Sequence, residues 1–251
     1  MRLDGGPLGR SRRRTGGQKL ARSMYSGPIL GELRAAIVSR QLEKSTRLVE
    51  ERLAEEFGVS RGPIRSALLA LEAEGLVRPL ASGGMEVTGF GVADLSSLFA
   101  VRHLLESTAV RWGVEMGADP TPVTAALADF AAHTGDSPRS MVGMDIAFHK
   151  TIVEFGQSRF LVQAWDSLAP VLETAIAVGN DAVGSEVALR GSSEETHTRI
   201  YQAHIEIAEA LLRGDAERVS TLLAQQFAEA ESSLRAYYAQ PRRASEARVD
   251  S

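Results

Sequence analysis

The hydrophobic residues of this chain recur every three to four positions over most of its length, which is the spacing of one face of an α-helix. A first helix is predicted from Pro28, and two short helices follow over residues 50–57 and 60–74. Residues 76–78 and 85–88 instead have strand character and flank a glycine-containing turn, which predicts a small β-hairpin.

The pattern changes after Gly91, where the strand signals disappear and long helices are predicted as far as Tyr238. Asp94 is the expected N-cap of the first of them. Another is predicted over residues 139–155, and two to four further helices are expected after it. The glycine-rich stretch 179–193 is expected to separate some of these helices.

These patterns divide the chain into four regions. Residues 1–24 are rich in Gly, Arg and Ser without periodicity, and we expect them to form a disordered basic tail. A first domain is predicted over residues 25–90, within which residues 42–48 form a polar connection, and a helical domain over residues 92–238. Residues 239–251 are predicted to be a second disordered tail. The predicted fold class is mainly α.

Composition narrows the class of protein. With 44% hydrophobic and 24% charged residues, the chain is typical of a globular protein. It has no cysteine, which excludes disulfides, thiolate metal sites and a cysteine nucleophile. No apolar run approaches the roughly 18–20 residues that span a bilayer, and the basic N-terminus lacks the apolar segment of a signal peptide. We therefore expect a cytoplasmic protein that does not associate with membranes.

The net charge of −4 is unevenly distributed. Residues 1–88 contain 15 Lys and Arg against 10 Asp and Glu, a balance of +5, whereas the remainder contains 13 against 22, a balance of −9. A basic N-terminal third followed by an acidic remainder indicates a unit that binds a polyanion, joined to a domain with a different task.

Residues 50–74 have the pattern of a helix-turn-helix, the motif that places its second helix in the major groove of DNA. Gly58 permits the tight turn between the helices, Ser60 is the expected N-cap of the second helix, and Pro63 fits its first turn. Three apolar residues form the inward face of that helix: Ile64, Leu68 and Leu71.

Polar residues at the start of the second helix are candidates for reading DNA. Arg61 lies at its N-terminal tip, and Arg65 and Ser66 lie off the apolar stripe. Arginine pairs with guanine O6 and N7 through two hydrogen bonds, and free N–H groups at a helix start attract phosphate. The hairpin is then a wing whose tip, at Gly83 and Gly84, approaches the minor groove or the DNA backbone. An ordinary helical hairpin with exposed arginines is the less favoured interpretation.

Residues 34–87 resemble the DNA-binding domain of GntR-family regulators, a winged helix-turn-helix, and residues 53–65 and 71–77 carry the resemblance. It implies a homodimer on a palindromic operator in double-stranded DNA. It also implies that Arg61 and Arg65 read bases and that Gly62 lies close to the DNA.

The chain departs from the family pattern on the first helix of the motif. The family commonly has an arginine seven residues before the turn glycine, where it holds a phosphate, but this chain has Glu51 there. Arg52 follows, and one residue of shift turns a helical side chain by about 100°. Whether Arg52 supplies the missing phosphate contact is therefore left open.

Several polar residues of the helical domain fall on apolar faces that are expected to point into the core. Asp145 lies within one such stripe and His149 at its border, His204 lies on a second, and Gln226 lies at the centre of a third. Burying a polar group unpaired costs on the order of 1–3 kcal/mol, so these groups need partners. Their convergence from three helices predicts a pocket.

Residues 94–238 resemble the FCD-type ligand-binding domain of the FadR subfamily, an antiparallel helical bundle. Four short motifs carry the resemblance: Asp94-Leu95, Val101-Arg102 with Leu105-Glu106, residues 145–149, and Gly214-Asp215. Many members bind a divalent metal through an Asp and a His four residues apart and two further histidines. The resemblance thus implies three metal ligands here: Asp145, His149 and His204.

The fourth ligand position falls at Gln226, and glutamine is a poor ligand for a borderline-soft ion. Three ligands still suffice for an open site of the Zn, Ni or Mn class that water or an effector carboxylate completes. The alternative is a pocket without metal that binds its effector by hydrogen bonds. Arg102 is a further candidate effector contact, because a guanidinium binds carboxylates in a bidentate manner. Its alternative role is an ion pair with Glu106 one turn along the same helix.

The sequence therefore predicts a transcription regulator that is not an enzyme, and the family resemblance implies a repressor rather than an activator. A small effector, an organic or sugar acid, is expected to change its operator affinity from the pocket of the helical domain. One alternative is a hydrolase in which Asp145, His149 and His204 hold a metal that activates water, but no general base can be named beside them. An architectural DNA-binding protein is the other, and it would not require inward-facing polar residues.

Overall fold

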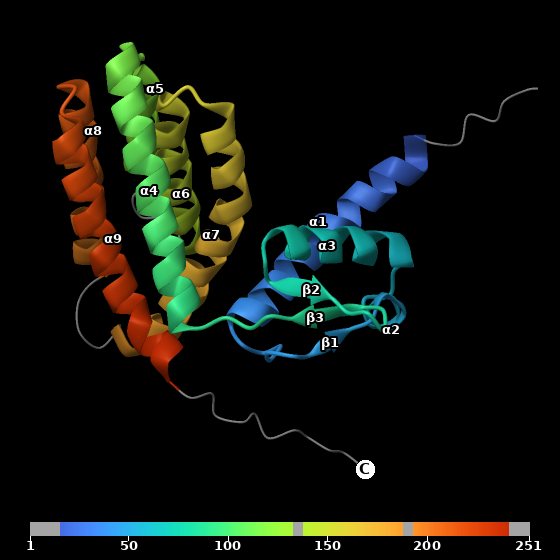
Figure 1. The fold of residues 1–251 in the computed structure, drawn as a ribbon. Helices are drawn as coiled ribbons and strands as arrows, with labels where there is room; N and C mark the ends of the chain where they lie inside the picture. Colours follow the sequence, from blue (N-terminus) through green and yellow to red (C-terminus); the bar gives the residue numbers. More distant parts are fainter. Residues whose placement is uncertain (1–15, 133–137, 188–192, 241–251) are drawn as a thin grey trace, which may run out of the picture.

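The structure, a computed structural model, describes residues 16–132, 138–187 and 193–240 and has two parts (Figure 1). One part combines a small antiparallel sheet with helices, and the other is a bundle of longer helices that run alongside one another. A short segment leads from the last strand of the sheet into the first helix of the bundle. The mainly α fold class predicted from the sequence is confirmed.

The N-terminal part contains the predicted helix-turn-helix. Its elements in chain order are α1 (Gly16–Val38), β1 (Arg47–Leu48), α2 (Glu50–Glu56), α3 (Arg61–Ala73), β2 (Val77–Pro79) and β3 (Met85–Val87). Gly58 has a φ of 63° in the turn between α2 and α3, and the extended backbone of Ser60 begins α3. The predicted inward face of α3 is confirmed, because Ile64, Leu68 and Leu71 are at most 1% exposed.

The sheet has the strand order β1-β3-β2, and both pairs are antiparallel. The pairing of β2 with β3 is the predicted hairpin. The prediction that residues 42–48 form a polar connection is wrong at its end, where β1 adds a third strand. A strand of two residues is too short to show alternation, although Leu48 buries its side chain in the core.

The first helix starts earlier than predicted. α1 begins at Gly16, so part of the segment predicted to be a disordered tail is helical, and Pro28 lies inside the helix. Proline at position 28 is compatible with a first turn, which is why the sequence predicts a start there, but a helix can also include proline at the cost of one backbone hydrogen bond. The predicted disorder of residues 1–15 and 241–251 lies outside the described residues.

The helical bundle comprises α4 (Val92–Met116), α5 (Thr121–Ala132), α6 (Pro138–Phe155), α7 (Arg159–Val187), α8 (Ser193–Leu212) and α9 (Ala216–Ala239). α4 packs against α6, α7 and α9, and its green ribbon lies beside the red ribbon of α9 in Figure 1. Fully buried side chains fill the space between the helices, among them Phe148, Ile152, Trp165, Leu172 and Leu223. Within the described ranges, no helix is long and apolar enough to cross a membrane.

Two local predictions for the bundle are corrected. The N-cap of α4 is Gly91, and Asp94 instead lies in the first turn, where its carboxylate accepts the N–H of Gly91 at 2.9 Å. The first part of the glycine-rich stretch does not end a helix as predicted, because α7 continues through Gly179 to Val187. A side chain at Gly179 would overlap Leu234 of α9, so this glycine permits close helix packing rather than a turn.

Candidate metal and effector site and DNA-reading surface

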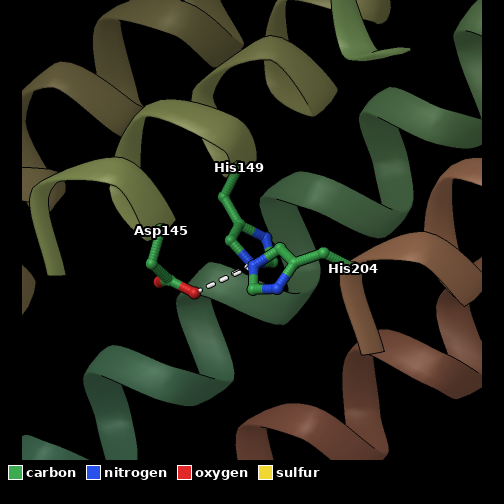
Figure 2. Close-up of side chains that lie close together, drawn as sticks. All are labelled: Asp145, His149 and His204. Atoms are coloured by element: carbon green, nitrogen blue, oxygen red, sulfur yellow. Dashed lines mark hydrogen bonds and ion pairs between the residues drawn. The ribbon is translucent and has the colours of Figure 1, made fainter. Parts of the chain in front are cut away.

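A cluster of polar side chains lies in the middle of the helical bundle. Figure 2 shows Asp145 and His149, one turn apart on α6, pointing toward His204 of α8. One potential ligand atom from each of the three residues lies within 4.8 Å of the other two. Both histidines are fully buried, and the Asp145 side chain is 17% exposed. The structure thus brings together the three residues that the sequence singled out as metal ligands.

Acceptors on the far side of each imidazole fix its orientation. His149 Nδ1 lies 2.6 Å from Glu106 Oε2, and His204 Nδ1 lies 2.7 Å from the carbonyl oxygen of Ile200. Since both partners accept, each Nδ1 carries the hydrogen and each Nε2 faces the cluster. His204 Nε2 lies 3.0 Å from Asp145 Oδ1, and His149 Nε2 lies 3.6 Å from the same atom. With neutral histidines, three lone pairs face one another, so the arrangement calls for a cation.

Arg102 and Glu106 of α4 complete the charge pattern. Arg102 Nε donates to Glu106 Oε1 at 2.9 Å, and its Nη2 donates to Asp145 Oδ2 at 3.1 Å. The guanidinium lies 4.2 Å from the ring centroid of Phe227. The ion pair considered from the sequence is present, and Arg102 reaches the cluster as well. Glu106 was not among the predicted site residues, because spacing along α4 gives no sign of its contact with His149.

The pKa values reflect a shortage of positive charge in the cluster. Burial raises the pKa of Asp145, but the positive charges of Arg102 and of protonated His149 outweigh burial and hold this pKa well below 3.8. Burial and Arg102 lower the pKa of His149, but Glu106 and Asp145 outweigh them and raise it above 6.5. Two carboxylates face one guanidinium, so the cluster favours a further cation, either a proton on His149 or a metal ion.

Gln226 of α9 also reaches the cluster. Its Nε2 lies 3.3 Å from His204 Nε2 and donates to it, since the His204 hydrogen is on Nδ1. Its Oε1 is buried and has no hydrogen-bond partner among the described residues, and the same holds for His149 Nε2. Both are acceptor atoms, and a cation would satisfy both.

The predicted DNA-reading residues of α3 lie on its outer face. Arg61, Arg65 and Ser66 are exposed, and Gly62 is half-buried. The Ser66 hydroxyl donates to the carbonyl of Gly62 at 3.1 Å, which holds it against its own helix. Arg61 pairs with Glu50 of α2 at 3.2 Å, a contact that a phosphate or base would have to replace.

The wing tip and the first helix of the motif hold the other predicted contacts. Gly83 and Gly84 both have a φ of 84°, and a side chain at Gly84 would meet the carbonyl oxygen of Leu48 at 2.8 Å. Arg47 of β1 donates to the carbonyls of Ser82 and Gly83 at 3.1 and 2.9 Å. Sequence reasoning missed this contact, which holds the tip in shape. On α2, the side chains of Glu51 and Arg52 are both exposed.

Comparisons with known proteins agree with this architecture. Residues 27–87 match the family model of bacterial regulatory proteins, gntR family. Residues 97–229, which are 133 of the 251 residues, match the FCD domain. A winged helix-turn-helix joined to a helical domain with a buried polar cluster defines a DNA-binding transcription regulator. The chain belongs to the GntR family, and its FCD domain is consistent with the FadR subfamily.

Curated relatives support the same assignment. The gluconate operon transcriptional repressor of Bacillus subtilis (strain 168) is 30% identical over 201 residues, which cover 78% of this chain and 79% of the relative. The protein of the same name from Bacillus licheniformis is 31% identical over 62% of this chain and 65% of the relative. The probable D-xylose utilization operon transcriptional repressor of Paenarthrobacter nicotinovorans is 24% identical over 80% of this chain and 84% of the relative.

Solved structures share the fold. Lar, described as controlling expression of the Listeria monocytogenes agr system, superposes with a TM-score of 0.64 at 18% identity, covering 89% of this chain and 98% of that chain. McbR/YncC of E. coli gives a TM-score of 0.61 at 18% identity, covering 85% and 98%. The family and the relatives are transcription regulators rather than enzymes, so the hydrolase alternative is not supported.

Proposed function

We propose that this regulator is a repressor whose affinity for its operator changes when a small organic or sugar acid binds in the helical domain. The observation that carries the proposal is the convergence of Asp145, His149 and His204 in the core of the bundle. Such a cluster is costly to bury without a bound cation or ligand, so stability alone does not account for it.

We further propose that a divalent metal ion of the Zn, Ni or Mn class binds these three residues. Support comes from the unpartnered buried Nε2 of His149 and from the acceptors on each Nδ1, which orient both rings as metal ligands are usually oriented. The metal would supply positive charge and an open coordination position for a carboxylate oxygen of the effector. Arg102 would add charge beside it, and Gln226 would line the same space.

The choice of an acid as effector rests on charge and on relatives. A carboxylate is the natural ligand for a cationic centre flanked by Arg102. Two relatives are named for the gluconate operon, and gluconate is a sugar acid. We therefore propose a sugar acid or a related organic acid as the class of effector.

On DNA, we propose a homodimer that places two copies of α3 in successive major grooves of a palindrome, about 34 Å apart. Arg61 and Arg65 would read bases from each copy, with Ser60, Gly62 and Ser66 close to the backbone. Arg52 would contact phosphate from α2, and the wing tip at Gly83 and Gly84 would approach the minor groove. Since the bacterial chromosome lies in the cytoplasm, we place the protein there.

The test selects an operator in vitro from random DNA with the purified full chain, and then measures operator affinity with and without a panel of sugar and organic acids. The metal-loaded protein is expected to lose at least about fivefold in affinity with one member of the panel, as for a typical allosteric coupling. Asp145→Asn should remove that response and retain operator binding. If no acid changes the operator affinity or the melting temperature of the metal-loaded protein, the effector half of the proposal is wrong.

A further inference from the structure

The unpartnered oxygen of Gln226 is the feature of the cluster that the proposed three-ligand site leaves unexplained. The amide enters from α9, the helix next to α8, and only its nitrogen is used, in the 3.3 Å contact with His204 Nε2. Its Oε1 is buried and has no partner in the part of the chain that the structure describes. A buried carbonyl oxygen without a donor is unfavourable, and a bound cation would remove that cost.

We propose that Gln226 Oε1 is the fourth protein ligand of the metal ion, and that this oxygen donor reduces the advantage of Zn²⁺ and Ni²⁺ over Mn²⁺ compared with a histidine at the same position. This inference rests on the proposed metal site. A half-turn of the terminal amide exchanges its nitrogen and oxygen and gives up a single hydrogen bond, the one to His204. Once a metal takes the lone pair of His204 Nε2, that hydrogen bond is lost in any case, so the turned amide has no competing contact with His204.

The choice of ion follows from the donor atoms. With Gln226 the protein offers two imidazole nitrogens, one carboxylate oxygen and one amide oxygen. Oxygen donors suit Mn²⁺, whereas imidazole nitrogen increases the advantage of Zn²⁺ and Ni²⁺. A histidine at position 226 would add a third nitrogen and move the preference toward those ions. Gln226 is therefore a residue that determines metal specificity in this chain.

The exposed neighbour Gln225 provides a matched control, because it lies on the same helix and has the same side chain. The full chain is freed of metal with a chelator and titrated separately with Mn²⁺, followed by electron paramagnetic resonance of the free ion, and with Zn²⁺, followed by competition with a chromophoric chelator. The variants are Gln226→Leu, Gln226→His and the control Gln225→Leu. Circular dichroism checks that each variant is folded.

Gln226→Leu is expected to weaken Mn²⁺ binding by about tenfold, as loss of a ligand-shell group typically does. Gln226→His is expected to tighten Zn²⁺ binding by about tenfold and to change Mn²⁺ binding by less than about threefold. Gln225→Leu should leave both affinities unchanged. The proposal is overturned if Gln226→Leu binds Mn²⁺ with the same affinity as the unaltered chain, or if Gln226→His increases the affinities for Mn²⁺ and Zn²⁺ by the same factor. If the unaltered chain binds neither ion, the proposed metal site fails and this inference fails with it; if it binds Mn²⁺ but position 226 has no effect, the inference fails alone.

Discussion

At the scale of single residues, Glu106 has a larger role than its position on α4 suggests. One oxygen accepts from Arg102 and the other holds His149 Nδ1 at 2.6 Å, so this carboxylate sets the tautomer of a proposed ligand and balances a buried guanidinium. The group is fully buried. Removing its charge while keeping its shape would separate these electrostatic roles from simple packing.

Glu106→Gln is therefore expected to weaken metal binding by about tenfold, because the imidazole loses a strong acceptor behind its Nδ1. It should also lower the free energy of unfolding by about 3 kcal/mol, since the buried positive charge of Arg102 loses one of the two carboxylates that balance it. Metal titration and chemical denaturation measure the two effects. Glu115→Gln, at an exposed position of the same helix, is the control and should change neither. An unaltered metal affinity in Glu106→Gln would contradict the assigned orientation of His149.

The raised pKa of His149 predicts that metal binding releases a proton. Below that raised pKa the metal-free imidazole is protonated, and a metal ion must displace the proton. Metal affinity should thus increase with pH up to the raised pKa of His149 and level off above it, where His149 is already neutral. Calorimetry in two buffers of different ionisation enthalpy measures the protons released. A pH-independent affinity with no proton release would show that His149 is not a ligand.

Arg65 permits a residue-scale test of the DNA-reading surface. Arg65→Ala is expected to lower affinity for the selected operator by about 1–3 kcal/mol and to relax the preference at one base position, because a bidentate base contact is lost. Affinity for unrelated DNA should change little. Arg213→Ala, at an exposed position of the bundle, is the control. Fluorescence anisotropy with operator and scrambled DNA measures both, and retained base preference in Arg65→Ala would contradict α3 as the recognition helix.

At the scale of secondary-structure elements, the sequence predicted the helices and the hairpin that have a periodic pattern or characteristic turn residues. It missed features that have no such local pattern. The stripes of α3 and α6 and the hairpin were found because periodicity and turn residues are local signals. β1 was missed because two residues carry no alternation, and the start of α1 was misplaced because Pro28 is compatible with a first turn and with a helix interior. Contacts between helices, such as Glu106 with His149, depend on how α4 and α6 are placed in space, and no local pattern encodes that.

Gly113 is an example of such an interhelical constraint and yields a prediction for α4. A Cβ at this position would overlap the Phe155 ring and lie 2.7 Å from the Phe155 carbonyl oxygen, so α4 and α6 can approach closely only with glycine there. Gly113→Ala should destabilise the protein by about 1–3 kcal/mol, as overpacking of a core does. Gly31→Ala in α1, where a Cβ meets nothing within 4 Å, should be stabilising by about 0.5–1 kcal/mol. Thermal and urea denaturation compare the two, and equal effects would contradict close packing of α4 on α6.

At the scale of the whole molecule, α9 connects the polar cluster to the DNA-binding part. Gln226 lies near the middle of α9. Arg40, in the loop after α1, contacts the C-terminal end of the same helix. The Arg40 guanidinium donates to the carbonyls of Tyr237 and Gln240 at 2.9 Å each and to that of Tyr238 at 3.3 Å. These carbonyls lie at the negative end of the helix dipole, where a cation is stabilising.

Arg40→Gln is expected to weaken this connection, because glutamine cannot reach three carbonyls or carry the charge. The melting temperature should fall, and the free energy of unfolding should decrease by about 1–3 kcal/mol, because the carbonyls lose their hydrogen-bond donor. If α9 transmits the state of the cluster, the effector should also change operator affinity less in Arg40→Gln than in the unaltered chain, while metal affinity stays the same. Arg235→Gln, which removes an exposed ion pair on the same helix, is the control and should retain the full response. A full response in Arg40→Gln would mean that coupling between the two parts follows another contact, such as the packing of α1 against α7.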